Sequence, residues 1–316
     1  MSKTFGPEST TDDLLDGRDL TGLHAFITGV SSGLGLETAR ALAARGARIT
    51  GAARNLDKAR EALSRSSGVK LVALDLASLR SVRTCADALL ADGAPIDVVV
   101  ANAGVMACPQ GKTVDGFETQ FGINHLGHFL LINRIAPLLR QGSRVVVVSS
   151  AAHHFTDVDL DDPNFERTPY QEFVAYGRSK TANILFAVEF DRRHKSAGVR
   201  ASAVHPGAIA ETELARHLTP ALAAQVEALI KESEDRGSPI LFKTIPQGAA
   251  TTVWAAVVAS ADDVGGQYCE DCDVAGAAVD GGGFAGVRPY ALDPDRAKAL
   301  WALSEQMVRE QFGGPA

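Results

Sequence analysis

Several features that mark other classes of protein are scarce in this chain of 316 residues. It has only four cysteines, too few for a disulfide framework in a chain of this length. It contains no uninterrupted apolar run of about 18 residues, so no membrane-spanning helix is expected. Residues 1–22 are polar and acidic and lack the apolar core of a signal peptide. We therefore expect a cytoplasmic protein that does not enter a membrane.

Positive charge is also in short supply. The chain has 31 Lys and Arg against 38 Asp and Glu, a net charge of −7, and its basic residues form no long run. Binding to nucleic acid needs clustered basic side chains, so nucleic acid is not an expected partner. Hydrophobic residues make up 46% of the chain, enough for a substantial core. These numbers favour a globular protein that acts on a small molecule.

Two of the cysteines lie close together, in Cys269-Glu270-Asp271-Cys272. A structural zinc ion needs four ligands, and no second pair of Cys or His residues lies nearby in the sequence. We therefore predict no metal site, and two ordinary thiols near a strand.

Apolar runs of strand length alternate with helical patterns along most of the chain. This alternation predicts an α/β protein with a Rossmann fold, a doubly wound parallel sheet with helices on both faces. No internal repeat or linker divides the chain. The expected strands are 24–28, 47–53, 70–74, 96–101, 144–149 and 199–204, and the expected helices are 36–45, 56–63, 79–90, 117–139, 173–194, 248–260 and 294–312.

We expect one domain over residues 21–316, preceded by a polar arm, residues 1–20. Residues 208–246 break the alternation and lie beyond the carboxyl end of a strand, where open α/β sheets bind ligands. This segment is a candidate substrate lid, although an ordinary surface insertion would have the same pattern. Residues 281–283 are three glycines that predict a flexible turn, and residues 284–316 form a C-terminal extension.

The run Thr28-Gly29-Val30-Ser31-Ser32-Gly33-Leu34-Gly35 joins the first expected strand to the first helix. Its spacing, Gly-x-x-x-Gly-x-Gly, differs from the Gly-x-Gly-x-x-Gly fingerprint but keeps the same physical ingredients. Side chains are missing where the backbone must approach phosphates, and the N-terminus of a helix offers unpaired N–H donors. Glycines can also serve turn geometry alone, but the strand–turn–helix context favours a pyrophosphate site.

The end of the second strand indicates which dinucleotide is bound. Sites for NAD usually place Asp or Glu there to bind the ribose hydroxyls, but this chain has Arg54 and no acid. Because a guanidinium matches a 2′-phosphate, we favour NADP over NAD. The alternative is that Arg54 only ends a strand at the surface. Asp75, just past the third strand, could bind the adenine amino group or cap the following helix.

Tyr176 and Lys180 are four residues apart in an expected helix and so lie on one face. Hydride transfer to a carbonyl leaves an alkoxide that needs a proton. A free phenol titrates at about 10, but a neighbouring ammonium and an oxidised nicotinamide both favour the phenolate. Such pairs also occur by chance on solvated helices, so the pair gains weight only from the residues that accompany it.

The accompanying residues follow the ends of other strands. Ser149 and Ser150 come directly after a run of four valines, where a hydroxyl can bind a substrate oxygen. The complete set is Thr28, Gly29, Gly33, Gly35, Asp75, Asn102, Ala103, Gly104, Asn124, Ser150, Tyr176, Lys180, Pro206 and Gly207. With this set the chain resembles the classical branch of the short-chain dehydrogenase/reductase family over roughly residues 20–283.

The resemblance implies roles for single residues. Tyr176 would be the general acid/base, and Ser150 would orient the substrate carbonyl. Lys180 would lower the pKa of the tyrosine and hold the nicotinamide ribose, and Asn124 would hold a water in a proton relay. Motifs and resemblance together give the expected cofactor-binding residues: Gly29, Ser31, Ser32, Gly33, Leu34, Gly35, Arg54, Asp75, Leu76, Asn102, Ala103, Gly104, Tyr176, Lys180, Pro206, Gly207, Ile209 and Thr212.

One position departs from the family pattern. Ala101 stands where the family often has a first asparagine before Asn102, a change from which we expect little consequence. The polar arm, the segment after Ser150 and the long tail are most similar to the branch that contains retinol dehydrogenases and related carbonyl reductases.

Apolar and aromatic residues follow the serine and occupy the candidate lid. They suit a hydrophobic or aromatic alcohol or carbonyl substrate, and the preference for NADP favours reduction. Adjacent histidines do not converge on one metal ion without other ligands, so we treat the two that follow Ser150 as pocket or surface groups. The candidate pocket residues are His153, His154, Phe155, Phe165, Tyr170, Leu214, Leu218 and Leu222.

Two other functions use the same motifs. A dinucleotide-sensing protein without catalysis occurs on this fold, although such proteins typically lack the tyrosine or the lysine. Reduction of a conjugated C=C bond is the other, because enzymes of that kind resemble the cofactor half of this chain. Helices 117–139 and 173–194 could pair across a two-fold axis, so a homodimer or homotetramer is expected, although packing on their own sheet would also satisfy them.

Overall fold

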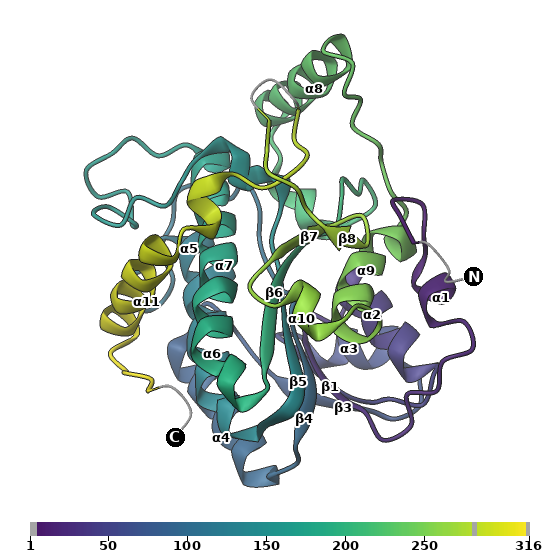
Figure 1. Ribbon diagram of the computed structural model, residues 1–316. Coiled ribbons are helices and arrows are strands. Elements are labelled where there is room, and N and C mark those ends of the chain that lie inside the picture. The colour runs from purple at the N-terminus through teal and green to yellow at the C-terminus, as the bar shows by residue number, and fades with distance from the viewer. Residues whose placement is uncertain (1–4, 280–282, 314–316) are drawn as a thin grey trace.

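An eight-stranded sheet runs through the middle of the molecule, in the order β3-β2-β1-β4-β5-β6-β7-β8 (Figure 1). The computed structural model describes residues 5–279 and 283–313. The first seven strands are parallel, and β8 runs antiparallel to β7. The strands are β1 (His24–Thr28), β2 (Arg48–Ala53), β3 (Val69–Ala73), β4 (Ile96–Ala101), β5 (Leu139–Val148), β6 (Arg200–His205), β7 (Tyr268–Glu270) and β8 (Asp273–Val274). The predicted Rossmann fold is confirmed.

Helices cover both faces of this sheet. One layer contains α4 (Leu79–Asp92), α5 (Thr119–Phe121), α6 (Gly127–Ile135), α7 (Glu172–His194) and α11 (Pro294–Val308). The other contains α1 (Thr11–Leu15), α2 (Gly33–Ala43), α3 (Leu56–Ala62), α9 (Ile245–Val253) and α10 (Ala261–Val264). Figure 1 shows these two layers on opposite sides of the strands.

The four valines of β5 show why the sheet is buried on both sides. Val145 and Val147 belong to the core beneath α6 and α7, whereas Val146 and Val148 belong to the core beneath α2 and α9. Successive side chains of a strand point to opposite faces, so an uninterrupted apolar run requires cover on both. Each such side chain stabilises the fold by about 1.5–3 kcal/mol relative to an exposed one.

The predicted ends differ most where the pattern is polar or short. Strand β5 begins at Leu139, five residues before the expected start at residue 144. The sequence did not predict this part of the strand because most of its first residues are exposed and show no apolar alternation. Ser143 holds that stretch through a hydrogen bond to the Ile96 carbonyl oxygen, at 2.7 Å. Strands β7 and β8 were not predicted, since so few residues give no periodicity.

The expected helix 117–139 is interrupted rather than uniform. A π-helical turn, Gly122–Leu126, lies between α5 and α6, and a 3₁₀ turn, Ala136–Leu138, precedes β5. A second π-helical turn, Trp254–Val258, follows α9. Such turns are frequent at functional sites, and the first contains Asn124.

The polar arm is more than a solvated tail. It contains α1, which starts at a capping box between Thr10 and Asp13. Leu14 and Leu15 of this helix are buried in the same core as α2. The sequence did not predict this packing, because the arm is mostly polar and only two leucine side chains anchor the helix.

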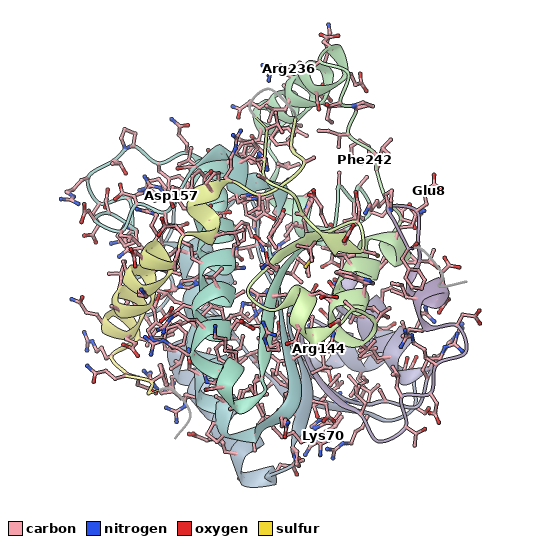
Figure 2. All side chains as sticks on the ribbon, viewed as in Figure 1. Glu8, Lys70, Arg144, Asp157, Arg236 and Phe242 are labelled. Atoms are coloured by element: carbon pink, nitrogen blue, oxygen red, sulfur yellow. The ribbon has the colours of Figure 1, made fainter. Side chains whose placement is uncertain are left out.

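The candidate lid stands away from the sheet. Its main helix, α8 (Pro220–Asp235), lies above the ends of the strands in Figure 1. Figure 2 places Arg236 and Phe242 at that end of the molecule, with Lys70 at the opposite end. The base of the segment is closed where the Lys243 backbone N–H donates to the Ala208 carbonyl oxygen, at 2.8 Å.

The C-terminal extension covers the long helix α7. Trp301 of α11 is buried, with its ring centre 5.0 Å from that of Phe129 and 5.9 Å from that of Phe186. The guanidinium of Arg193 lies 4.1 Å from the centre of the same indole. An apolar part of α6 and α7, two helices that could have paired across a two-fold axis, is therefore covered by α11 within one chain.

Two further predictions concerned a flexible turn at residues 281–283 and the absence of a membrane-spanning helix. Of the glycines 281–283, the first two lie outside the described residues. Among residues 5–279 and 283–313, no helix has the length and apolar character needed to cross a membrane.

Candidate active site

A cavity of about 970 Å³ opens at the carboxyl ends of the parallel strands. It runs from the glycine turn after β1, past the ends of β4 and β5, to the lid. All the sequence-predicted catalytic and cofactor-binding residues line it except Gly35 and Asn124. The fold thus brings together residues from the first and second halves of the chain at the edge where ligands bind in open sheets.

The glycine turn has little room for side chains. Gly29 has a φ of +77°, and a Cβ placed there would lie 3.0 Å from atoms of Ala103. A Cβ on Gly35 would lie 2.4 Å from both the Gly29 carbonyl oxygen and the Asn102 side-chain nitrogen. Gly35 therefore lets α2 approach the strands from behind the cavity, whereas Gly29 and Gly33 form its wall. These are the roles that the sequence pattern predicted for a phosphate-binding turn.

Asn102 and Thr28 join the ends of β1 and β4. The Thr28 hydroxyl oxygen accepts hydrogen bonds from the backbone N–H groups of Asn102 and Ala103, both at 3.0 Å. The Asn102 amide donates to the Thr28 carbonyl oxygen at 2.9 Å. Asn102 thus supports the strands next to the cavity, as expected, and Ala101 is a buried residue of β4.

Two cations stand at the end of β2. Arg54 is exposed and lines the cavity, and so does Lys58 in the first turn of α3, which sequence reasoning missed. Lys58 forms an ion pair with Glu213 of the lid. The available signal was its place in the first turn of the helix that directly follows β2.

Asp75 does not cap α4, whose N-cap is Ser78, and its contact with adenine stays a prediction. It lines the cavity, and its Oδ1 accepts a hydrogen bond from the Ala77 backbone N–H at 3.0 Å, as a cap of the turn before α4. Further along, Thr212 lies over the glycine turn, 3.6 Å from where a Cβ of Gly33 would be.

Tyr176 and Lys180 lie one turn apart on α7, and both are almost completely buried. The Lys180 Nζ atom is 5.6 Å from the centre of the tyrosine ring and donates to the Val148 carbonyl oxygen at 3.0 Å. Burial lowers the pKa of Lys180 to about 8, so the ammonium still predominates at neutral pH.

The pKa of Tyr176 is shifted in the direction opposite to our expectation. Burial raises it to about 12, and only a hydrogen bond from the Ser150 side chain lowers it. The reason is desolvation, because the closed surroundings disfavour the charged phenolate. The protein by itself therefore keeps Tyr176 protonated, and the expected decrease caused by Lys180 is not produced.

The two serines after β5 have separate roles. The Ser149 hydroxyl is buried and donates to the Lys180 carbonyl oxygen at 2.8 Å, which is a structural contact. Ser150 precedes the 3₁₀ turn Ala151–Phe155, and its Oγ accepts from the Ala152 backbone N–H at 3.1 Å. Ser150 is also the hydroxyl that acts on Tyr176. This arrangement agrees with our choice of Ser150 as the residue that faces a substrate oxygen.

Asn124 does not line the cavity with its side chain. Its Oδ1 accepts from the Val105 backbone N–H at 2.8 Å, and its Nδ2 donates to the Val105 carbonyl oxygen and the Ser179 hydroxyl, both at 2.9 Å. These bonds use both N–H groups of the amide, and the Asn124 backbone carbonyl oxygen accepts from His128 Nδ1 at 3.0 Å. The role of Asn124 in holding a relay water stays a prediction.

The predicted pocket wall is partly wrong. Phe155, Leu214 and Leu218 line the cavity, but His153, His154, Phe165, Tyr170 and Leu222 do not. The sequence cannot tell which way a loop side chain points. Residues that line the cavity and were missed are Phe173, Val226, Leu229, Ile230, Phe242, Lys243 and Phe284.

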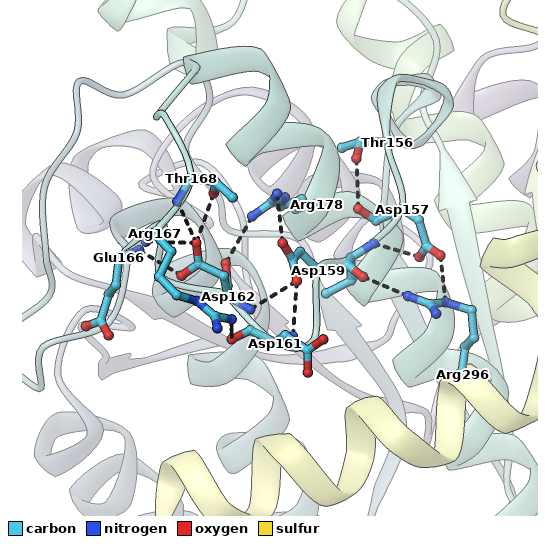
Figure 3. A network of polar contacts seen from close by, with 11 residues as sticks. Thr156, Asp157, Asp159, Asp161, Asp162, Glu166, Arg167, Thr168, Arg178 and Arg296 are labelled. Carbon is cyan, nitrogen blue, oxygen red and sulfur yellow. Dashed lines mark hydrogen bonds and ion pairs between the residues drawn. The ribbon is translucent and has the colours of Figure 1, made fainter.

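Phe165 and Tyr170 instead hold the loop between Ser150 and α7. Their ring centres are 5.1 Å apart, and the guanidinium of Arg178 lies 4.1 Å from the centre of the Phe165 ring. Figure 3 shows the polar part of this network, in which the Asp162 carboxylate accepts from backbone N–H groups of residues 166–168. Arg178 donates to the Asp162 carbonyl oxygen at 3.0 Å. The loop is thus attached to α7 two residues after Tyr176.

The two cysteines lie near a strand, as the sequence predicted. Cys269 lies in β7 and Cys272 in the turn after it, and both thiols are free and buried. Burial raises their pKa values to about 12 and about 11. Within the described part of the chain, no group of three or more His, Cys, Asp or Glu side chains could hold a metal ion.

Comparisons with known proteins agree with this geometry. The family model for short chain dehydrogenase matches residues 23–223. The chain is 43% identical over 293 residues to short-chain dehydrogenase/reductase prx1 of Penicillium roqueforti, covering 90% of this chain and 84% of that protein. It is 39% identical to human retinol dehydrogenase 14, covering 91% and 86%.

A solved structure gives the same result. The crystal structure of an uncharacterized protein from Mycobacterium Paratuberculosis superposes with a TM-score of 0.74 at 36% identity, covering 96% of this chain and 98% of that one. The chain is therefore an oxidoreductase that belongs to the short-chain dehydrogenase/reductase family.

Proposed function

We propose that this protein interconverts a hydrophobic or aromatic secondary alcohol, or an aldehyde/alcohol pair, and the corresponding carbonyl compound with NADP(H). The observation that carries the proposal is the position of Tyr176, Ser150 and Lys180 in the cavity whose other end is the glycine turn and Arg54. One cavity thus offers a proton donor, a hydroxyl for the substrate oxygen and a cradle for a dinucleotide.

The residues at the cradle fit a nicotinamide dinucleotide. Gly29 and Gly33 both have positive φ and line the cavity with backbone, and the N-terminus of α2 faces the same space. Arg54 and Lys58 put two cations where a 2′-phosphate would bind, although the carboxylate of Glu213 pairs with Lys58, and the residues that directly follow β2 include no acid. The bound cofactor would supply the hydride at its nicotinamide ring.

The tyrosine is suited to donate a proton. Because burial holds the pKa of Tyr176 at about 12, the phenol stays neutral at physiological pH and can protonate an alkoxide as it forms. Ser150 lies beside it and would hold the carbonyl oxygen in place. Lys180 is nearly buried, and within residues 5–279 and 283–313 its ammonium donates only to the Val148 carbonyl oxygen, so it has donors left for ribose hydroxyls.

The substrate end of the cavity is apolar. Phe155, Phe173 and Phe284 line it. The ring centre of Phe155 is 6.3 Å from that of Phe173 and 5.7 Å from that of Phe284. Side chains of the lid complete the wall. This lining favours a bulky apolar substrate, and the name of the human relative, retinol dehydrogenase, refers to an alcohol of that kind.

Assembly and location remain proposals from the sequence. We propose a cytoplasmic protein, and a homodimer or homotetramer that associates through a face other than the one covered by α11. The contacts of Trp301 support that restriction, because separating α11 from α7 would expose a large buried ring.

The test is turnover of purified protein with NADPH and NADH against a panel of aromatic ketones, aldehydes and enones, with product analysis. We expect the fastest turnover with NADPH and an aromatic carbonyl, and an alcohol as product. Reduction of the C=C bond of an enone would instead indicate an ene-reductase. Tight binding of NADPH with no turnover of any substrate would indicate a sensor.

A further inference from the structure

His153 is a fully buried residue to which the proposed reaction assigns no role. It lies in the 3₁₀ turn directly after Ser150, and its ring does not line the cavity. Both ring nitrogens have a partner. Nδ1 is 2.8 Å from the Ser150 carbonyl oxygen, and Nε2 is 3.2 Å from the Arg288 backbone nitrogen.

These partners determine where the proton of the imidazole sits. A carbonyl oxygen can only accept, and a backbone N–H can only donate. Nδ1 must therefore carry the proton, and Nε2 must offer its lone pair to Arg288. A second proton on Nε2 would face the N–H group of Arg288, so the ring is neutral. Burial, which lowers the pKa of His153 to about 3, acts in the same direction.

The backbone of Ser150 is held mainly by this one residue. Its carbonyl oxygen accepts the Nδ1–H of His153 and also the His153 backbone N–H, at 3.1 Å. Its Oγ accepts from the Ala152 backbone N–H. The serine hydroxyl keeps its own proton to donate, toward Tyr176 or toward a substrate oxygen.

The same turn is tied to residues 284–290, which we name the C-terminal strap. Besides the bond from Arg288, the Tyr290 hydroxyl donates to the His153 carbonyl oxygen. His154 adds a third contact, from Nε2 to the Gly286 carbonyl oxygen at 2.9 Å. The strap is therefore bonded to the turn that follows the serine.

The strap also forms part of the substrate wall. Phe284 and Ala285 line the cavity, and the Phe284 ring packs edge-on against Phe155, the last residue of the turn. This short turn thus contacts Ser150 at its start and the aromatic side chain of Phe284 at its end.

From these contacts we infer that His153 is a positioning residue, which directs Ser150 toward the substrate oxygen and couples the serine to the strap. The inference rests on the proposed function, because it assigns to Ser150 the task of orienting a carbonyl. His153 itself touches no reacting atom.

Two substitutions distinguish the contributions of the two hydrogen bonds that the ring nitrogens make. His153→Asn keeps an N–H donor near the place of Nδ1, and His153→Gln keeps an oxygen near the place of Nε2. If the bond to Ser150 matters, His153→Gln should lower kcat about 10-fold or more, since small misplacement of a reacting group is costly. His153→Asn should keep kcat within about threefold of the unchanged protein. The Kd for NADPH, followed by fluorescence, should not change in either variant.

His154→Leu is the matched control, because it removes a contact to the strap and leaves Ser150 untouched. We expect it to raise KM for bulky aromatic ketones about threefold, with kcat nearly unchanged. Equal losses of kcat in His153→Asn and His153→Gln, in proportion to their losses of thermal stability, would overturn the inference. An unchanged kcat in His153→Gln would overturn it as well.

A measurement that needs no turnover separates this inference from the proposed function. Nitrogen-15 NMR of the imidazoles, with His153 assigned by its loss in His153→Gln, should show a neutral ring protonated at Nδ1. If the protein reduced no carbonyl at all, the proposed function would fail, and the spectrum would still test the two hydrogen bonds of His153 from which the inference is drawn. A ring protonated at Nε2, or doubly protonated at neutral pH, would refute it.

Discussion

The two ends of the cavity are built in different ways. At the cofactor end, backbone forms much of the wall, and a Cβ on Gly29 or Gly35 would lie 3.0 Å or less from residues at the ends of β1 and β4. At the substrate end, half-buried and exposed side chains form the wall, and they come from the turn after Ser150, the lid and the C-terminal strap. A change at the first end should therefore disturb the fold itself, whereas a change at the second should alter mainly which molecule is bound.

Tyr176 lies where the two ends meet, so its loss should have the largest effect. Tyr176→Phe removes the proton donor and keeps the ring, and we expect kcat to fall about 10²–10⁴-fold. The control is Tyr170→Phe, which removes a hydroxyl that bonds to the Cys108 carbonyl oxygen outside the cavity. Steady-state kinetics with NADPH would measure both. Comparable activity in the two variants would show that Tyr176 is not the acid/base.

Gly35→Ala tests whether the cofactor end depends on backbone contact. Its new Cβ would lie 2.4 Å from the Gly29 carbonyl oxygen, and overpacking of this kind lowers the free energy of unfolding by about 1–3 kcal/mol. Gly276→Ala is the control, since no atom lies within 4 Å of a Cβ there. Urea denaturation gives both values. If Gly35→Ala had the same free energy of unfolding as its control, the cofactor end would not depend on close backbone contact.

Arg54→Ala tests the choice of cofactor. Loss of a charge-assisted contact to the 2′-phosphate should raise the Kd for NADPH about 10-fold, corresponding to about 1.4 kcal/mol, and leave the Kd for NADH unchanged. Lys58→Ala should act in the same direction. Lys70→Ala is the control, because Lys70 lies at the opposite end of the sheet (Figure 2). Fluorescence titration measures the affinities, and an equal loss for both cofactors would argue against a 2′-phosphate site.

Phe284→Ala tests the side-chain wall of the substrate end. We expect KM for bulky aromatic ketones to rise about three- to tenfold, with little change for a small ketone and none in the Kd for NADPH. Val279→Ala serves as the control, since Val279 is 70% exposed. If the small and the bulky ketone were affected equally, Phe284 would not determine specificity.

Glu213→Gln should have the smallest effect, and it changes a contact between the two ends of the cavity. Glu213 belongs to the lid, and it pairs with Lys58 at the cofactor end. Both side chains are largely exposed, so the pair contributes only about 0–1 kcal/mol. Freeing Lys58 should lower the Kd for NADPH about two- to threefold at low salt, and the gain should vanish at high salt. Glu227→Gln, on the exposed face of α8, is the control. A gain that persists at high salt would rule out a purely electrostatic origin.

The sequence by itself determined the layers of this protein and the identity of its main polar groups. Strands β1 and β4 begin and end where the apolar runs predict, and the spacing of Tyr176 and Lys180 places them one turn apart on α7. Both results are local, because a strand or a helix repeats its geometry over a few residues. The glycine turn is equally local, since the missing side chains are read directly from the chain.

Only the tertiary structure decided which side chains meet across long stretches of sequence. It turned Phe165 and Tyr170 away from the cavity, brought Phe284 into it, and laid α11 over α7. It also reversed the expected shift in the pKa of Tyr176, because burial is a property of all the elements packed around a residue. A sequence specifies each element by short-range periodicity, whereas the direction of a loop side chain and the dielectric around a phenol depend on the whole packed molecule.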